Sequence, residues 1–148
     1  MRTYTHEKII PVQAKYAWQA LTQMNLWLPK LQTVTTISYD ETSPFFQVGK
    51  MYDVHTPEGI SMKSQLKMID SEHMKVAIGA NFFLLNSRLS CSVSQIDDKR
   101  CEISRIQMYP GLIGSIFTSL FNKREASETE EYLAVWEDYA LRLFQNEL

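Results

Sequence analysis

The C-terminal segment from Gly111 to Leu148, GLIGSIFTSLFNKREASETEEYLAVWEDYALRLFQNEL, decides what kind of fold the chain can adopt. It contains no proline, and its only two glycines lie at its start. Its later apolar residues recur at intervals of three and four, as in Tyr132, Val135, Trp136, Tyr139 and Leu143. This spacing places them on one face of a helix. The segment therefore predicts one long C-terminal helix with an apolar stripe that packs against another layer.

Two parts of this segment leave alternatives open. Ser127-Glu128-Thr129-Glu130 matches a capping box, so the helix is expected either to restart or kink there, or to continue as a solvated run. The stretch 111–121 combines both glycines with apolar side chains. We expect it to form either the first turns of a rigid helix or a movable gate over an interior site.

The residues before this helix predict mainly strands. From Thr33 to Tyr109, strand-like segments are separated by turn signals at 43–44, 57–59, 70–72 and 97–99. This spacing is typical of an antiparallel meander. Arg2–Ile10 predicts an edge strand that ends before Pro11. Helical spacing within 12–22, and a helical or irregular piece over 25–31, predict two short helices after it.

Composition excludes several classes of protein. The chain has 148 residues, with fifteen Lys and Arg against seventeen Asp and Glu, for a net charge of −2. A nucleic-acid or anionic-membrane partner is therefore not expected. No segment is apolar enough for a membrane span or a secretory signal, and Cys91 and Cys101 lack zinc-site spacing. We expect one cytoplasmic domain over residues 1–148, with reduced thiols and without a metal or other cofactor.

The element order extends this picture to a specific fold. A strand, two short helices, six strands and a long helix form the order of the α+β helix-grip fold. Ile10-Pro11-Val12, followed by Ala17-Trp18 and Ala20-Leu21-Thr22, resembles the opening of the START-like SRPBCC superfamily, specifically its polyketide cyclase/dehydrase branch. Val48-Gly49, 66–70 and the aromatic-rich helix carry the resemblance through most of the chain.

The resemblance implies a curved antiparallel sheet of about seven strands around the C-terminal helix, with the two short helices between strands one and two. It also implies a ligand-binding domain, in a superfamily that spans enzymes, lipid carriers and ligand sensors. Gln23 and Leu31 depart from the family pattern, so the resemblance assigns no particular ligand.

The turn at Pro57-Glu58-Gly59 indicates which side chains of the first central hairpin face inward. A three-residue loop pairs Thr56 with Ile60, Val54 with Met62 and Tyr52 with Ser64. Alternation along the second strand places Ile60, Met62, Ser64, Leu66 and Met68 on the buried face. Met51, Asp53 and His55 are then expected to point outward.

Alternation also indicates which side chains of the later hairpin face inward. The odd-numbered residues from Phe83 to Val93 alternate with a mostly polar even-numbered set, which begins at Leu84, and are expected to face inward. A turn within 97–100 would pair Val93 with Ser104, Cys91 with Ile106 and Leu89 with Met108. Arg88 and Arg105 would then point outward. Cys91 and Cys101 would be roughly 17 Å apart, too far for a disulfide.

The predicted inner surface is apolar and contains no carboxylate, histidine or lysine, so it assigns no catalytic residue. His6, His55 and His73 lack ligand spacing and are expected to be solvent-exposed rather than metal-binding. Trp18 and Trp136 are expected to pack in the core. The predicted cavity-lining residues are Tyr52, Val54, Met62, Ser64, Leu66, Ile78, Phe83, Leu85, Ser87, Leu89, Ile106, Met108, Ile116, Phe117, Leu120 and Tyr132.

These features favour non-covalent binding, transport or sensing of an apolar or amphipathic small molecule, lipid-like or polyketide-like, between sheet and helix. One alternative is a cyclase/dehydratase-type enzyme, in which a polar group expected to point outward, or one from the helices such as Tyr132 or Arg124, would have to reach the cavity. Another is a module that binds a protein partner through 112–121 or an exposed sheet edge. The sequence favours the binding protein over the enzyme.

Overall fold

The computed structural model describes residues 2–82 and 85–147, and for Arg2, Phe82, Leu85 and 111–127 it describes the backbone alone. The strands are β1 (Arg2–Ile10), β2 (Thr36–Ser38), β3 (Met51–His55), β4 (Ser61–Asp70), β5 (Lys75–Phe82), β6 (Leu85–Asp97) and β7 (Arg100–Tyr109). The helices are α1 (Ala14–Thr22), α2 (Met24–Trp27), the 3-10 turn η1 (Leu28–Lys30) and α3 (Gly111–Asn146). The element order is the predicted one.

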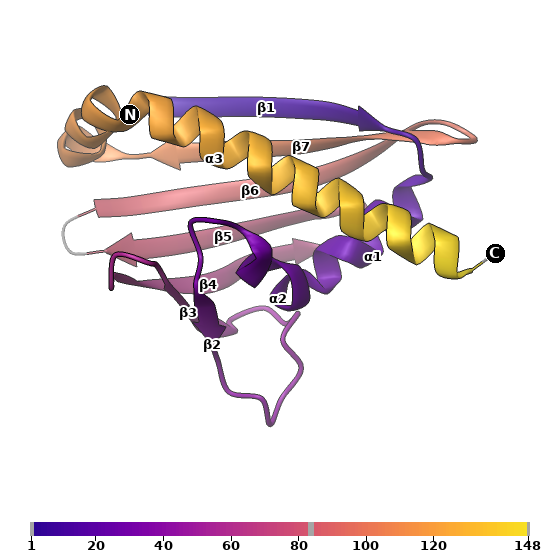
Figure 1. The fold of residues 1–148 in the computed structure, drawn as a ribbon, viewed down its shortest axis with the longest axis horizontal. Coiled ribbons are helices and arrows are strands. Elements are labelled where there is room, and N and C mark those ends of the chain that lie inside the picture. Colours follow the sequence, from indigo (N-terminus) through magenta and orange to yellow (C-terminus); the bar gives the residue numbers. More distant parts are fainter. Residues whose placement is uncertain (1, 83–84, 148) are drawn as a thin grey trace.

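All seven strands form one antiparallel sheet in the order β1-β7-β6-β5-β4-β3-β2. Figure 1 shows α3 crossing one face of this curved sheet, with α1 and α2 on the same side. The predicted helix-grip architecture is confirmed. The helix is continuous through 127–130, so it does not restart there, although both views show its first turns set at an angle to the long remainder.

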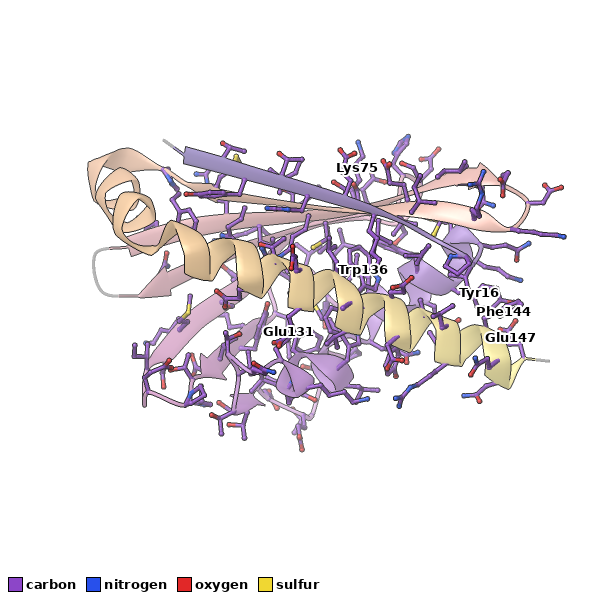
Figure 2. The ribbon with its side chains drawn as sticks, turned by 45° about the horizontal axis from the view of Figure 1, so that its top comes forward. Tyr16, Lys75, Glu131, Trp136, Phe144 and Glu147 are labelled. Atoms are coloured by element: carbon purple, nitrogen blue, oxygen red, sulfur yellow. The ribbon has the colours of Figure 1, made fainter. Side chains whose placement is uncertain are left out.

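Two tryptophans join the helices to one another. Trp136 of α3 and Trp27 of α2 are fully buried. Their indole N–H groups donate to backbone carbonyls of α1, from Trp136 to Ala17 at 2.9 Å and from Trp27 to Ala20 at 2.8 Å. Both acceptor residues are alanines, whose methyl groups are small enough to let the two indole rings reach the backbone of α1. Figure 2 shows Trp136 between α3 and the layer behind it.

Trp18 does not occupy the core position predicted for it. It is half-buried, and its ring packs edge-on against Phe46, with the centroids 5.6 Å apart. The buried face of α1 consists instead of Ala14, Tyr16, Ala17, Ala20 and Leu21. The prediction for Trp18 is wrong because small residues, rather than the largest apolar one, allow α1 to approach the two buried indoles.

The first central hairpin has the predicted register. Tyr52 pairs with Ser64 and Val54 with Met62. The predicted turn is also present, because the Thr56 N–H donates to the Ile60 carbonyl at 2.9 Å. Further along β4 the pairing shifts between Leu66 and Met68. This bulge at Lys67 reverses the faces that follow it. Met68 is therefore 42% exposed rather than inward as predicted.

A second bulge changes the later hairpin. Asp97 pairs with Arg100 as the predicted turn requires, but Gln95 pairs with Cys101, so Ile96 is an extra residue in β6. The pairs beyond it are Val93 with Ile103, Cys91 with Arg105 and Leu89 with Gln107. The predicted register of β7 is wrong by one residue. Ser104, Ile106 and Met108 face outward, and Arg105 faces the helix.

The two tryptophans provide a test of this packing. Trp136→Ala removes a fully buried ring and should lower the free energy of unfolding by about 3–5 kcal/mol. Trp18→Ala removes a half-buried ring and should cost less than half as much. Urea denaturation of both variants measures the difference. Equal losses would contradict the placement of Trp18 outside the core.

Candidate functional site

Arg105 lies in the interior, beneath α3, and only 7% of it is exposed. Its Nη1 donates to Thr129 Oγ1 of α3 at 2.8 Å, and its Nη2 donates to Gln107 Oε1 at 3.3 Å. Its guanidinium carbon lies 4.7 Å from the centroid of the Tyr132 ring. A permanent positive charge is thus held between the sheet and the helix, with a hydroxyl, an amide oxygen and an aromatic face around it.

Neighbouring strands add polar groups to the same face. The inner residues of β7 change from apolar at Cys101 and Ile103 to polar at Arg105 and Gln107. On β1, His6 lies opposite Arg105 and Tyr4 lies opposite Gln107. The Tyr4 hydroxyl is buried and forms no hydrogen bond within the described part of the chain. His6 is half-buried, so the prediction that it is an exposed strand histidine is wrong.

Hydroxyl and thiol groups complete the polar cluster. Tyr132 Oη lies 3.8 Å from Cys91 Sγ. Tyr52 on β3 and Ser64 on β4 are each 5% exposed. Burial raises the pKa of Tyr132 well above its ordinary value and raises the pKa of Tyr52 as well. Burial also raises the pKa of Cys91 to about 11, against the opposing effect of the Arg105 charge. At neutral pH these three groups are therefore protonated and able to donate hydrogen bonds.

An apolar surface borders this cluster on the sheet. Val54, Met62, Ala80 and Leu89 lie on the inner face but are half-exposed. Deeper residues of the same face, Leu66, Val76 and Ile103, are completely buried. The inner face is consequently closed to solvent at the α1 end. Its side chains are partly accessible to solvent at the other end, where Figure 1 shows the β3–β4 turn and the first turns of α3. Leu89 is paired with Gln107, so the apolar surface and the polar cluster are continuous.

The structure brings together part of the predicted cavity set. Tyr52, Ser64, Leu66, Ile78, Ser87 and Tyr132 are buried, and Val54, Met62 and Leu89 are half-buried; those on the strands share the inner face of the sheet. Ile106 and Met108 do not belong with them, because they pair with Ser90 and Arg88 on the outer face. Phe83 and the side chains of Leu85, Ile116, Phe117 and Leu120 lie outside the described part of the chain, as do the other side chains of the predicted gate.

The sequence pattern did not indicate that Tyr4, His6, Arg105, Gln107 and Thr129 belong to the site. Thr129 had a usable signal, because it precedes Tyr132 by three residues and Trp136 by seven and so shares their helix face. The other four depended on the register of β7. Since both alternating sets of that strand contain apolar residues, the pattern alone did not distinguish them.

Asp53 and His55 lie outside this site, as predicted. His55 bonds to the hydroxyls of Ser38 and Ser61 at 2.8 and 2.9 Å on the exposed side of the sheet. Two open hollows of about 370 and 420 Å³ flank Met51. In the first, Lys50 is held by the Asp40 carbonyl and by Ser43 Oγ at 2.7 Å, so its ammonium group fastens the loop before β3.

The buried thiol predicts a specific pH dependence of stability. Above about pH 9 the unfolded Cys91 thiol loses its proton while the folded one keeps it, so the folded state binds more protons. The free energy of unfolding should fall as pH rises, by about 1.4 kcal/mol per pH unit for one such group. Urea titrations under reducing conditions should show a smaller slope in Cys91→Ala. An unchanged slope would contradict the buried thiol.

Comparison with known proteins gives no match to any family model or curated protein, but many matches to solved structures. None of the helices in the described part of the chain is both long and apolar enough to cross a bilayer. Norcoclaurine synthase from Thalictrum flavum, in complex with dopamine and hydroxybenzaldehyde, has a TM-score of 0.74 and 17% identity over 99% of this chain and 88% of its own.

XoxI from Bacillus cereus has a TM-score of 0.71 and 14% identity, covering 97% of this chain and 98% of its own. The di-domain ARO/CYC protein BexL, from the BE-7585A biosynthetic pathway, has a TM-score of 0.69 and 10% identity over 94% of this chain and 46% of its own. Element order, sheet topology and these likenesses agree that the chain has the helix-grip fold.

Proposed function

We propose that this protein binds a small amphipathic molecule non-covalently between the sheet and α3. The observation that carries the proposal is the half-exposed inner surface of Val54, Met62, Ala80 and Leu89, next to a buried polar cluster. Apolar side chains that face inward yet remain accessible gain free energy when a ligand covers them. A few convergent polar groups at one end of such a surface orient the ligand.

The fold likenesses support a ligand-binding role in general. One norcoclaurine synthase structure contains dopamine and hydroxybenzaldehyde, two small aromatic molecules. These two molecules are ligands of norcoclaurine synthase, and they identify no ligand of this chain. In this chain, aromatic rings lie beside the polar cluster: those of Trp27 and Tyr132 pack edge-on with centroids 5.2 Å apart, and those of Phe45 and Tyr52 are tilted with centroids 5.2 Å apart.

Four groups of the cluster act as hydrogen-bond donors rather than as proton acceptors at neutral pH. Tyr52, Cys91 and Tyr132 have raised pKa values, and the Arg105 guanidinium remains charged. None of these four groups accepts a proton readily at neutral pH. His55 bonds to Ser38 and Ser61 on the exposed side of the sheet, and Asp53 lies on the same face of β3. Of the groups that the sequence offered for an enzyme, Asp53 and His55 therefore face away from the inner surface, and the side chain of Arg124 lies outside the described part of the chain.

A charge placed on the accessible inner surface tests the proposal. Met62→Lys should weaken binding of Nile red, a neutral apolar dye, at least tenfold, because the ammonium group would be desolvated by the ligand. Met51→Lys is the matched control, since Met51 is 59% exposed and lies on the opposite face of the neighbouring strand. Fluorescence titration measures both dissociation constants.

The control should change dye affinity by less than twofold. If Met62→Lys and Met51→Lys have equal effects, or if the wild-type protein does not bind the dye, the interior is not the binding site. Native mass spectrometry of the freshly purified protein provides a second measurement, in which a bound lipid-like mass is expected.

A further inference from the structure

We infer that Ser38, His55 and Ser61 form a second site, on the outer face of the sheet, which hydrolyses small neutral esters. Ser38 is the nucleophile of this site, His55 is its base, and Ser61 positions the base. The three residues lie on the neighbouring strands β2, β3 and β4, on the face that α3 does not cover. The site is therefore separate from the interior binding surface and does not depend on a ligand there.

The imidazole of His55 joins the two serines. Its Nε2 lies 2.8 Å from Ser38 Oγ, and its Nδ1 lies 2.9 Å from Ser61 Oγ. A hydroxyl in hydrogen-bond reach of a histidine that a third group orients is the arrangement that activates a serine for attack. A neutral imidazole has one N–H and one nitrogen that accepts. When the Nδ1–H donates to Ser61, Nε2 is the nitrogen that accepts the Ser38 proton.

Paired strands hold this geometry in place. His55 is directly opposite Ser61 in the β3–β4 pair, and Ser38 lies two residues beyond Thr36, which is opposite His55 in the β2–β3 pair. The Thr35 N–H also donates to the His55 carbonyl at 2.7 Å, which fixes β2 at this point. Side chains on paired strands are positioned more precisely than side chains on loops.

The hollow beside Met51 gives a substrate access to Ser38. Ser38 borders this hollow of about 420 Å³ together with Tyr39, Met51 and Lys63. Tyr39 and Met51 offer apolar walls to an acyl group, and the Lys63 ammonium supplies positive charge for the oxygen that becomes negative during attack. Ser61 lines neither of the two hollows that flank Met51. Ser38 rather than Ser61 is therefore the nucleophile.

Asp53 restricts the charge of the substrate. It lies opposite both Ser38 and Lys63 in the row across the three strands, and it borders the same hollow. Its carboxylate would repel a negatively charged substrate. The expected substrate is consequently a neutral ester.

The reaction converts an ester and water into a carboxylic acid and an alcohol. The Ser38 oxygen bonds to the carbonyl carbon while its proton passes to His55 Nε2. The bond from that carbon to the alcohol oxygen then breaks, and the alcohol leaves with the proton from His55. Water attacks the acyl-serine with His55 again carrying the proton, which releases the acid and restores Ser38.

Hydrolysis of para-nitrophenyl butyrate, a neutral ester, tests the inference. Ser38→Ala and His55→Gln should each lower kcat/KM about a hundredfold, because the first removes the nucleophile and the second keeps an amide that accepts no proton. Ser61→Ala should lower kcat without changing KM, and Ser61→Thr should restore it. Absorbance of the released nitrophenolate measures all four variants.

Matched substitutions separate this site from other sources of hydrolysis. Ser90→Ala replaces a serine on the outer face of β6, and His73→Gln replaces an exposed turn histidine. Both should keep wild-type activity. Met62→Lys alters the interior surface and should also leave hydrolysis unchanged, so failure of the proposed binding function and failure of this site are measured independently.

Covalent labelling of the wild-type protein does not depend on any variant folding. A fluorophosphonate should form an oxygen–phosphorus bond to Ser38 and release fluoride, and peptide mass spectrometry locates the label. Labelling of Ser61, or absence of labelling, would overturn the inference. Equal hydrolysis by wild-type protein and Ser38→Ala, or loss of hydrolysis in Met62→Lys, would also overturn it.

Discussion

The extra residue Ile96 in β6 determines which side chains of β7 lie under the helix. Without it, the turn at Asp97 and Arg100 would place Ser104 and Ile106 inside and Arg105 in solvent. With it, the Arg105 guanidinium enters the interior, where it bonds to Thr129 and Gln107 and lies against the Tyr132 ring. The bulge also has a structural role: Gln95 Oε1 accepts the N–H of Ala14 at 2.7 Å and so caps the start of α1. The helix that receives both buried indoles is thereby fixed to the same hairpin.

The interior that results differs between its two ends. At the α1 end, Trp27, Trp136, Leu66 and Ile103 are fully buried and closely packed. At the other end, inner residues such as Val54 and Met62 remain partly accessible. The Arg105 cluster lies between these regions. A binding protein gains from this arrangement, because a rigid core holds the polar groups in position while the apolar surface accepts the rest of the ligand.

Local patterns predicted much of this architecture. Helical spacing in α3, the Pro57-Glu58-Gly59 turn and the alternation of β4 up to Leu66 identified the fold and the register of the first hairpin. The errors at Met68 and Arg105 each come from a single-residue bulge, at Lys67 in β4 and at Ile96 in β6. A bulge changes the face of every residue beyond it and leaves almost no mark in the sequence, since it is stabilised by distant contacts such as that of Gln95 with α1. Trp18 was misplaced because its size suggested burial, whereas close helix approach required alanine.

The most direct test of the account is a measurement of which β7 side chain contacts Tyr132. Proton–proton nuclear Overhauser effects in the isotope-labelled protein distinguish the two registers without any substitution. The account predicts contacts from the Arg105 side chain to the Tyr132 ring and to the Thr129 methyl group, with the Arg105 methylene resonances shifted upfield by the ring. Contacts from the Ile106 methyl groups to the Tyr132 ring would contradict it, because they would place Arg105 on the outer face of the sheet.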